Sequence, residues 1–288
     1  FGPDGNGVPR IKRFLTDLKH EGMAPTSIMF FKDVGHSQEG AQEVSKLLDG
    51  GFFSGPKPQR LMQRLLTLAN LKADSVVLDF FSGSASTAHA VMSKNAEDGG
   101  HRKFIMVQLP EECDEQSEAY KAGYKNICEI GKERIRRAGD KIKSESPLTT
   151  QDLDIGFRVL KLDDTNMKDV YYAPDDYDQG MLAALESNIK EDRTDLDLLF
   201  GCLLEWGLPL SMPYTSEEIS GCTVHTYNDG DLIACFDENI PDEVVKTIAK
   251  RQPLRAVFRD SSFNGSPAKI NVTEVFKLLA PDTRVKVI

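Results

Sequence analysis

The stretch from Val76 to Val91, VVLDFFSGSASTAHAV, constrains the fold of this chain more than any other segment. It opens with three apolar residues of the kind that suits a strand buried on both faces. A turn of small residues from Ser82 to Ser86 follows, and Thr87 to Met92 is predicted to be helical. Small residues let a ligand approach the backbone, and the helix offers unpaired N–H groups and the positive end of its dipole. The pattern predicts a nucleotide-binding α/β crossover, with an ordinary strand-turn-helix as an equal alternative.

Composition indicates a globular chain of 288 residues, long enough for two domains. Its longest apolar run, Leu196 to Leu210, is broken by charged residues and glycine, so no membrane association is expected. The amino terminus has neither the features of a signal peptide nor an initiator Met, which indicates a piece of a longer chain. Five cysteines without a C-x-x-C pair indicate reduced thiols and a cytoplasmic protein. No histidines stand at metal-ligand spacing, so we predict no metal site.

Charge is distributed unevenly along the chain. The formal net charge of −10 argues against a surface that wraps nucleic acid as a whole. Residues 1–165 carry 23 basic and 24 acidic side chains, whereas residues 166–288 carry 12 and 21. This shift indicates a domain boundary near residue 165.

Several elements are predicted upstream of the turn. Ile28 to Phe31 is expected to be a short strand, followed by a helix from Ser37 to about Leu48. The stretch from Phe52 to Leu71 predicts another helix, whose buried face is formed by four leucines: Leu61, Leu65, Leu68 and Leu71. Lys57 stands between two prolines at the entrance of that helix. It is either a solvated turn residue or part of a ligand pocket.

A second buried strand is predicted from Phe104 to Val107, and Gln108 and Glu111 follow it. In dinucleotide-binding folds a side chain at this place holds ribose hydroxyls. Tyr120 to Lys143 predicts a long helix with a basic outer side: Lys132, Arg134, Arg136, Arg137, Lys141 and Lys143. A solvated face is the expected role of that side, and phosphate contact is the alternative. Phe157 to Leu162 alternates as a third strand.

Beyond about Asn166 a smaller mixed α/β domain is predicted. Its helices are Gln179–Ile189, Leu196–Trp206, Asp242–Arg251 and Pro267–Leu279, and its strands are Cys222–Tyr227, Asp231–Phe236, Leu254–Phe258 and Arg284–Ile288. Asn228-Asp229-Gly230 between the first two strands predicts a hairpin. The acids are scattered and His225 is the one histidine in this region, so we predict no catalytic constellation but a structural or assembly role.

The stretch VVLDFFSGSASTAHAV resembles motif I of the β-class, S-adenosyl-L-methionine-dependent amino-methyltransferases of DNA, whose pattern is Asp-x-Phe-x-Gly-Ser-Gly-Thr. Four residues match in place: Asp79, Phe81, Gly83 and Ser84. Ala85 replaces the second glycine, and we expect an ordinary negative φ there. FFSGPKPQRLMQRLL resembles motif X, which precedes motif I by about this distance in that class. KFIMVQLPEE through NICEIGKERIRRAGDKI is similar to the methylation (Mod) subunits of type III restriction-modification systems. The likeness covers the chain and is strongest from Ser27 to Asp164.

The resemblance implies an α/β fold, with a partial Rossmann-like methyltransferase sheet and a smaller mixed α/β carboxyl-terminal domain. It implies S-adenosyl-L-methionine as the cofactor, with its methionine end near Lys57 and its ribose at the end of the second strand. The cofactor-binding residues that it implies are Lys57, Asp79, Phe80, Phe81, Gly83, Ser84, Gln108 and Glu111. Whether Gln108 or Glu111 takes the ribose is left open.

The family's catalytic motif, Asp-Pro-Pro-Tyr, is absent, and Asp175-Asp176-Tyr177 lacks the prolines and follows motif I. We therefore expect no catalytic residue here and interpret the chain as the carboxyl-terminal part of a DNA adenine-N6 methyltransferase. The implied domains are the end of a target-recognition region (1–30), the AdoMet-binding part (31–165) and an acidic assembly domain (166–288). The implied partners are double-stranded DNA (through the parent protein), a second Mod copy and the restriction subunit.

Two alternatives are kept. A Rossmann-type nucleotide-binding oxidoreductase is less favoured, because no complete G-x-G-x-x-G is present and the second strand ends in Gln108 rather than an acid. A module devoted to subunit interaction is the other alternative, and it would make residues 166–288 the functional part.

Overall fold

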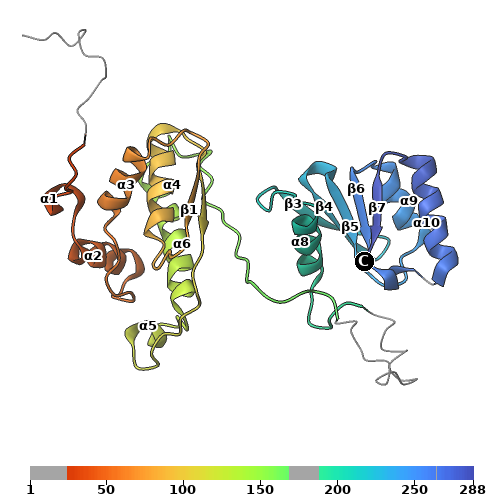
Figure 1. Ribbon diagram of the computed structural model, residues 1–288, viewed down its shortest axis with the longest axis horizontal. Coiled ribbons are helices and arrows are strands. Elements are labelled where there is room, and N and C mark those ends of the chain that lie inside the picture. Colours follow the sequence, from red (N-terminus) through yellow and green to blue (C-terminus); the bar gives the residue numbers. More distant parts are fainter. Residues whose placement is uncertain (1–24, 169–187, 264) are drawn as a thin grey trace, which may run out of the picture. The chain divides into compact units, whose positions relative to one another are not determined.

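The computed structural model describes residues 25–168, 188–263 and 265–288. The chain divides into an amino-terminal unit that ends at Phe157 and a carboxyl-terminal unit that begins at Arg158 (Figure 1). Both units combine helices with a β-sheet, so the α/β fold class is confirmed. The domain limits 1–30, 31–165 and 166–288 stay a prediction. Among the described helices, none has both the length and the apolar composition needed to cross a membrane.

The amino-terminal unit is built around two parallel strands. Its elements are α1 (Phe31–Val34), α2 (Ser37–Leu48), α3 (Gln59–Leu68), β1 (Val76–Asp79), α4 (Ser86–Asp98), β2 (Lys103–Met106), α5 (Glu118–Lys121) and α6 (Ile127–Glu145). β1 and β2 pair in parallel, with Leu78 opposite Ile105. The crossover helix α4 is buried because α3, the two strands and α6 all pack on it. Its alanines allow this close packing, and Ala88 and Ala90 are fully buried.

The other face of the two strands is uncovered in the described part of the chain. Leu78, Phe80 and Ile105 are between 51% and 64% exposed, although alternating apolar residues of this kind normally face a core. A shallow groove of about 430 Å³ runs beside β1, and its lining is mainly apolar and comes from α3 and β1. This face and edge of β1 lack the layer that such a strand requires.

Several expectations for the amino-terminal unit were wrong. Residues 28–30 form no strand, and the chain turns there into the short helix α1. In α3 it is Leu66 that is buried, while Leu65 and Leu68 are 41% and 38% exposed because they face the uncovered side. The long helix expected from Tyr120 is interrupted between α5 and α6, where Asn126 caps α6 by accepting the Glu129 N–H at 3.2 Å.

Another error concerns Phe157 to Leu162, which forms no strand in the described residues. The alternating pattern there reflects other contacts. The Phe157 ring packs near α4 and α6 and lies 5.6 Å from the Arg136 guanidinium. Leu162 is fully exposed.

The carboxyl-terminal unit is a five-stranded sheet between helices (Figure 1). Its elements are α8 (Asp195–Glu205), β3 (Tyr214–Ile219), β4 (Cys222–Tyr227), β5 (Leu232–Cys235), α9 (Asp242–Lys250), β6 (Arg255–Phe258), α10 (Gly265–Leu279) and β7 (Arg284–Val287). The strand order follows the chain, antiparallel from β3 to β5 and parallel from β5 to β7. α8 covers one face, whereas α9 and α10 cover the other. The hairpin and the other elements expected here are present, apart from the helix Gln179–Ile189. Its residues 179–187 lie outside the described part, and Ile189 forms an isolated bridge with Met167 instead of helix.

We expect hydrogen exchange to be fast across β1 and slow across β5. β1 has one partner strand, so alternate N–H groups remain unpaired, whereas all four residues of β5 are buried between β4 and β6. Exchange mass spectrometry on the monomeric chain should show protection in β5 at least about a hundredfold above that in Val76 to Phe80. Equal protection in both segments would mean that β1 is covered.

Candidate functional site: the turn between β1 and α4

The turn from Ser82 to Ser86 has a backbone that only a few residue types adopt easily. Gly83 has a φ of 51° and Ala85, the cap of α4, a φ of 59°. The expectation of a negative φ at Ala85 was therefore wrong. A left-handed alanine costs about 1 kcal/mol, so the surroundings must hold the turn in this form. The Ser82 N–H donates to the Val107 carbonyl at 3.2 Å, which fixes the turn to the end of β2.

Two side chains at the carboxyl ends of the strands bind the turn. Asp79 is half-buried; its Oδ2 accepts the Thr87 hydroxyl at 2.5 Å and its Oδ1 accepts the Phe81 N–H at 3.2 Å. The Oε1 atom of Gln108 accepts the Gly83 N–H at 2.7 Å. Both polar groups predicted from the sequence thus lie at the turn, and both are engaged in shaping it.

The aromatic pair after β1 is exposed. Phe80 and Phe81 are 64% and 74% exposed, and their ring centroids are 5.2 Å apart. Glu111 is also exposed on the loop after β2, where its backbone carbonyl accepts the Ile127 N–H at 3.0 Å. Its carboxylate makes no ion pair or hydrogen bond within the described residues, so it is available to a ligand.

Lys57 lies on the other side of the turn, between the buried Pro56 and Pro58. Its side chain is exposed, and its carbonyl accepts the Ser86 hydroxyl at 3.1 Å. Gly40 of α2 makes this approach possible, because a Cβ there would meet the Pro56 carbonyl at 2.2 Å. The structure therefore brings the proline-flanked segment, the turn and the ends of both strands together.

The sequence predicted the helix that contains α6, but not that this helix supports the turn. Arg134 of α6 was expected on the outer, solvated side, but it is 1% exposed, and its Nη1 atom donates to Ser84 and Ser86. The spacing contained the signal, because Arg134 follows the buried Ile130 by four residues and precedes the buried Ala138 by four. A charged residue on an apolar face is a better indicator of a special role than the count of basic residues.

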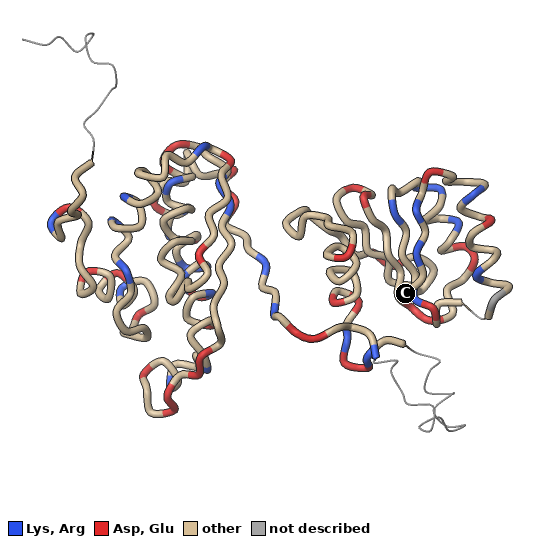
Figure 2. Tube along the Cα trace, viewed as in Figure 1, with Lys and Arg blue, Asp and Glu red and all other residues tan. Residues whose placement is uncertain are grey.

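The other basic residues of α6 lie where a solvated helix face predicts. Lys132, Arg136, Arg137 and Lys141 form ion pairs with nearby acidic side chains. Lys and Arg are interspersed with Asp and Glu along the described parts of both units (Figure 2). The expectation of a solvated face thus fits these residues, and an extended basic strip is not present among the described residues.

His89 of α4 is 8% exposed and packs within the amino-terminal unit. Burial and the nearby Arg134 charge lower the pKa of His89 to about 3. The imidazole is therefore neutral at physiological pH.

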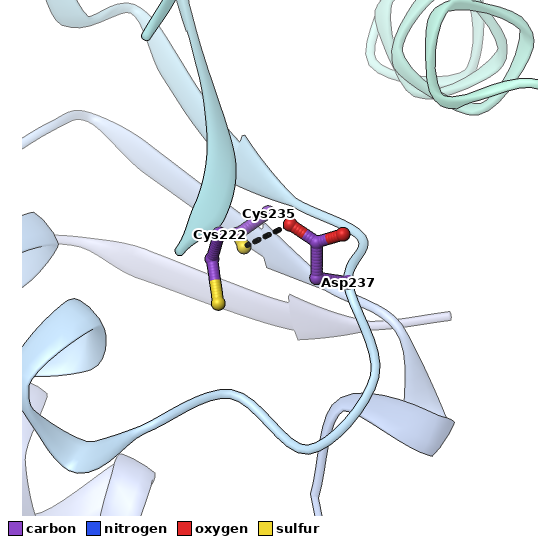
Figure 3. Close-up of side chains that lie close together, drawn as sticks. All are labelled: Cys222, Cys235 and Asp237. Carbon is purple, nitrogen blue, oxygen red and sulfur yellow. Dashed lines mark hydrogen bonds between the residues drawn. The ribbon is translucent and has the colours of Figure 1, made fainter. Parts of the chain in front are cut away.

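In the carboxyl-terminal unit, three potential metal ligands converge: Cys222, Cys235 and Asp237 lie with their ligand atoms within 4.8 Å of one another (Figure 3). Strand pairing brings them together, which sequence spacing does not reveal. Burial raises the pKa of both thiols, that of Cys235 to about 12. Asp237 accepts the Thr223 N–H, and its Oδ2 lies 4.0 Å from the Cys235 sulfur. These are the properties of protonated core cysteines. The absence of a metal site stays a prediction.

A cluster of three polar side chains connects α8 to the sheet of the carboxyl-terminal unit. The Nδ1 atom of His225 lies 2.8 Å from the Ser216 hydroxyl, and its Nε2 atom lies 3.4 Å from Asp195. In a hydrolytic triad the nucleophile's hydroxyl bonds Nε2 and the carboxylate bonds Nδ1, whereas here the serine lies at Nδ1 and the aspartate at Nε2. The ring is 4% exposed, so this group connects the first turn of α8 to β3 and β4.

Comparison with known proteins agrees with this geometry. Residues 16–136, which contain the turn, both strands and most of α6, match the model of a DNA methylase family. This segment of the chain is therefore similar to that DNA methylase family.

The similarity extends further to the Mod subunits of type III restriction-modification enzymes. The StyLTI Mod subunit of Salmonella typhimurium is 39% identical over 158 residues, which are 55% of this chain and 23% of that protein. The EcoPI Mod subunit of Escherichia phage P1 is 29% identical over 84% of this chain and 37% of its own length. The EcoP15I Mod subunit of Escherichia coli is 27% identical over 97% of this chain and 41% of its own length. The chain thus spans less than half the length of these curated relatives.

We expect Gly131→Val to destabilise the amino-terminal unit. A Cβ at Gly131 would lie 3.2 Å from the Gly83 carbonyl oxygen, so a larger side chain pushes α6 away from the turn. Overpacking of this kind costs about 2 kcal/mol in the free energy of unfolding. Asp140→Val, at an exposed position of the same helix, is the matched control and should change stability by less than about 0.5 kcal/mol. Denaturant unfolding measures both, and equal effects would show that α6 tolerates bulk against the turn.

Proposed function

We propose that this chain is the carboxyl-terminal part of a Mod-type DNA adenine-N6 methyltransferase and supplies its S-adenosyl-L-methionine site. One observation carries the proposal. The Gly83 turn is held between the carboxyl ends of β1 and β2 and the start of α4, within the segment that matches the DNA methylase family. In open α/β sheets, ligands bind in this crevice beyond the carboxyl ends of the strands. Different residues of the site suit different parts of the cofactor.

Each predicted binding residue then has a distinct task. The turn at Gly83 and Ser84 approaches the ligand closely, since Gly83 presents no side chain. Phe80 and Phe81 offer exposed faces against which an adenine ring can pack. Because Gln108 already accepts the Gly83 N–H, we assign the ribose hydroxyls to the free carboxylate of Glu111.

Asp79 holds the turn, and Lys57 borders the methionine end. Asp79 acts mainly through its bonds to Thr87 and the Phe81 N–H. The exposed ammonium of Lys57 stands on the segment that Ser86 fixes by its hydrogen bond. S-adenosyl-L-methionine, when bound, supplies an electrophilic methyl group on its sulfonium. The protein's own residues contribute positioning, which is the larger part of such a reaction.

The acceptor side of the reaction is expected from the remainder of the parent protein. An adenine amine inside duplex DNA is reached only when the base is flipped out of the stack. The groups that hold the flipped base in this family belong to Asp-Pro-Pro-Tyr, which the 288 residues do not contain. We assign the carboxyl-terminal unit to assembly with a second Mod copy or the restriction subunit, because it has its own two-sided core and an acidic composition.

Binding of the cofactor should depend on Asp79. We expect calorimetry to detect S-adenosyl-L-methionine binding to the chain and no comparable binding of NADH. Asp79→Ala should weaken that binding at least about tenfold, because the turn loses two hydrogen bonds. Asp140→Ala removes an exposed carboxylate elsewhere in the same unit and should leave the affinity unchanged. An affinity that Asp79→Ala does not alter would place the site elsewhere, and a preference for NADH would favour the oxidoreductase.

We also expect the chain to transfer no methyl group to DNA by itself. Neither the position nor the nucleophilicity of the adenine amine is maintained without the catalytic motif. Radiolabelled S-adenosyl-L-methionine and duplex DNA provide the assay, with an intact Mod subunit as the positive control. Incorporation of label by the purified chain would refute the division of labour proposed here.

A further inference from the structure

Arg134 of α6 connects, through hydrogen bonds, the two segments that border the proposed cofactor site. Its Nη1 atom donates to the Ser84 hydroxyl at 2.9 Å and to the Ser86 hydroxyl at 2.7 Å. Ser86 in turn donates to the Lys57 carbonyl at 3.1 Å. One buried guanidinium therefore orders both the glycine turn and the proline-flanked segment.

The charge of Arg134 has no counter-ion in the described part of the chain. No carboxylate there lies within 4.0 Å of its guanidinium, and its buried Nε atom has no hydrogen-bond partner. The negative charge of Glu43 raises the pKa of Arg134, but the Glu43 carboxylate makes its hydrogen bond elsewhere, since it accepts the Gln59 N–H at 2.8 Å. Burial lowers the pKa of Arg134 to about 10, so the side chain is still cationic at neutral pH. An unpaired buried charge is costly, which indicates that a negative charge arrives with a ligand.

We propose that Arg134 is a positioning residue whose buried positive charge makes this site select a methyl donor that carries a carboxylate. The inference rests on the proposed function and names the part of the cofactor that the turn recognises, the methionine carboxylate. Arg134 does not touch that group, because Ser84 and Ser86 cover it and are themselves 3% and 6% exposed. Its charge acts through the turn and adds to the positive end of the α4 dipole.

The size of the effect follows from Coulomb's law. A unit charge that acts across the turn on an opposite charge, in an effective dielectric constant of about 20, interacts strongly enough to change an affinity by roughly tenfold or more. A ligand that lacks the carboxylate should lose this contribution while it keeps its adenosine contacts.

The experiment compares two ligands on the same chain, S-adenosyl-L-methionine and its decarboxylated analogue, by calorimetry. The unmodified chain should bind the carboxylated ligand at least about tenfold more tightly. Arg134→Met, which keeps an unbranched apolar stem but removes the guanidinium, should reduce that preference about tenfold. Arg134→Lys should keep most of the preference. Arg136→Met removes a charge from the exposed side of the same helix and should leave the preference unchanged.

Three outcomes would overturn the inference. The first is an unmodified chain that binds both ligands equally well, a result that needs no variant and therefore holds even where Arg134→Met fails to fold. The second is an equal loss of affinity for both ligands in Arg134→Met, which would make Arg134 a structural support only. The third is an Arg136→Met effect as large as that of Arg134→Met. In all three the chain still binds S-adenosyl-L-methionine, whereas failure of the proposed function would appear as no binding of either ligand.

Discussion

The amino-terminal unit depends on the docking of α6 against the turn between β1 and α4. At Gly131 the helix comes so close that an added Cβ would lie 3.2 Å from the Gly83 carbonyl oxygen. One turn further along, Arg134 binds the hydroxyls of Ser84 and Ser86. Next to this polar contact, Ile135 and Ala138 pack with Ala85, Ala88 and Met92 of the turn and α4. A small residue, a buried cation and an apolar stripe thus combine in one interface.

This interface explains how the turn keeps an unfavourable backbone. Gly83 and Ala85 are both left-handed, and an alanine in this conformation loses about 1 kcal/mol relative to its ordinary backbone. The hydrogen bonds from Thr87 to Asp79 and from the Gly83 N–H to Gln108 hold the turn from the strand side. Because α6 holds it from the opposite side, the turn is fixed before any ligand arrives. Such preorganisation reduces the cost of ordering the site on binding.

Sequence patterns predicted local structure well and packing partners poorly. The helices α2 and α9 and the β4–β5 hairpin follow from apolar periodicity and the Asn-Asp-Gly turn, both of which are local signals. Leu65, Leu68 and the segment after Phe157 were misjudged because an apolar pattern shows that a face can be buried but not that a partner is present. Arg134 was misjudged for the converse reason, since a buried cation is recognised only from the groups that surround it. The motif residues at the turn were predicted from their resemblance, while their hydrogen bonds required the fold.

The exposed side of the site bears on how much of the binding surface this chain provides. Ligand pockets bury most of a small molecule's surface, yet Phe80 and Phe81 at the mouth of this site are largely exposed. The neighbouring face of β1 and β2 is apolar and open, and the groove beside β1 continues it. A wall that completes the site would cover this same face, so cofactor enclosure and burial of the sheet would be one event. The chain spans 23% to 41% of the length of its relatives, which leaves ample chain for such a wall in proteins of that length. In a protein that has such a wall, ligand affinity and the stability of β1 are therefore expected to rise together, because the same contacts would supply both.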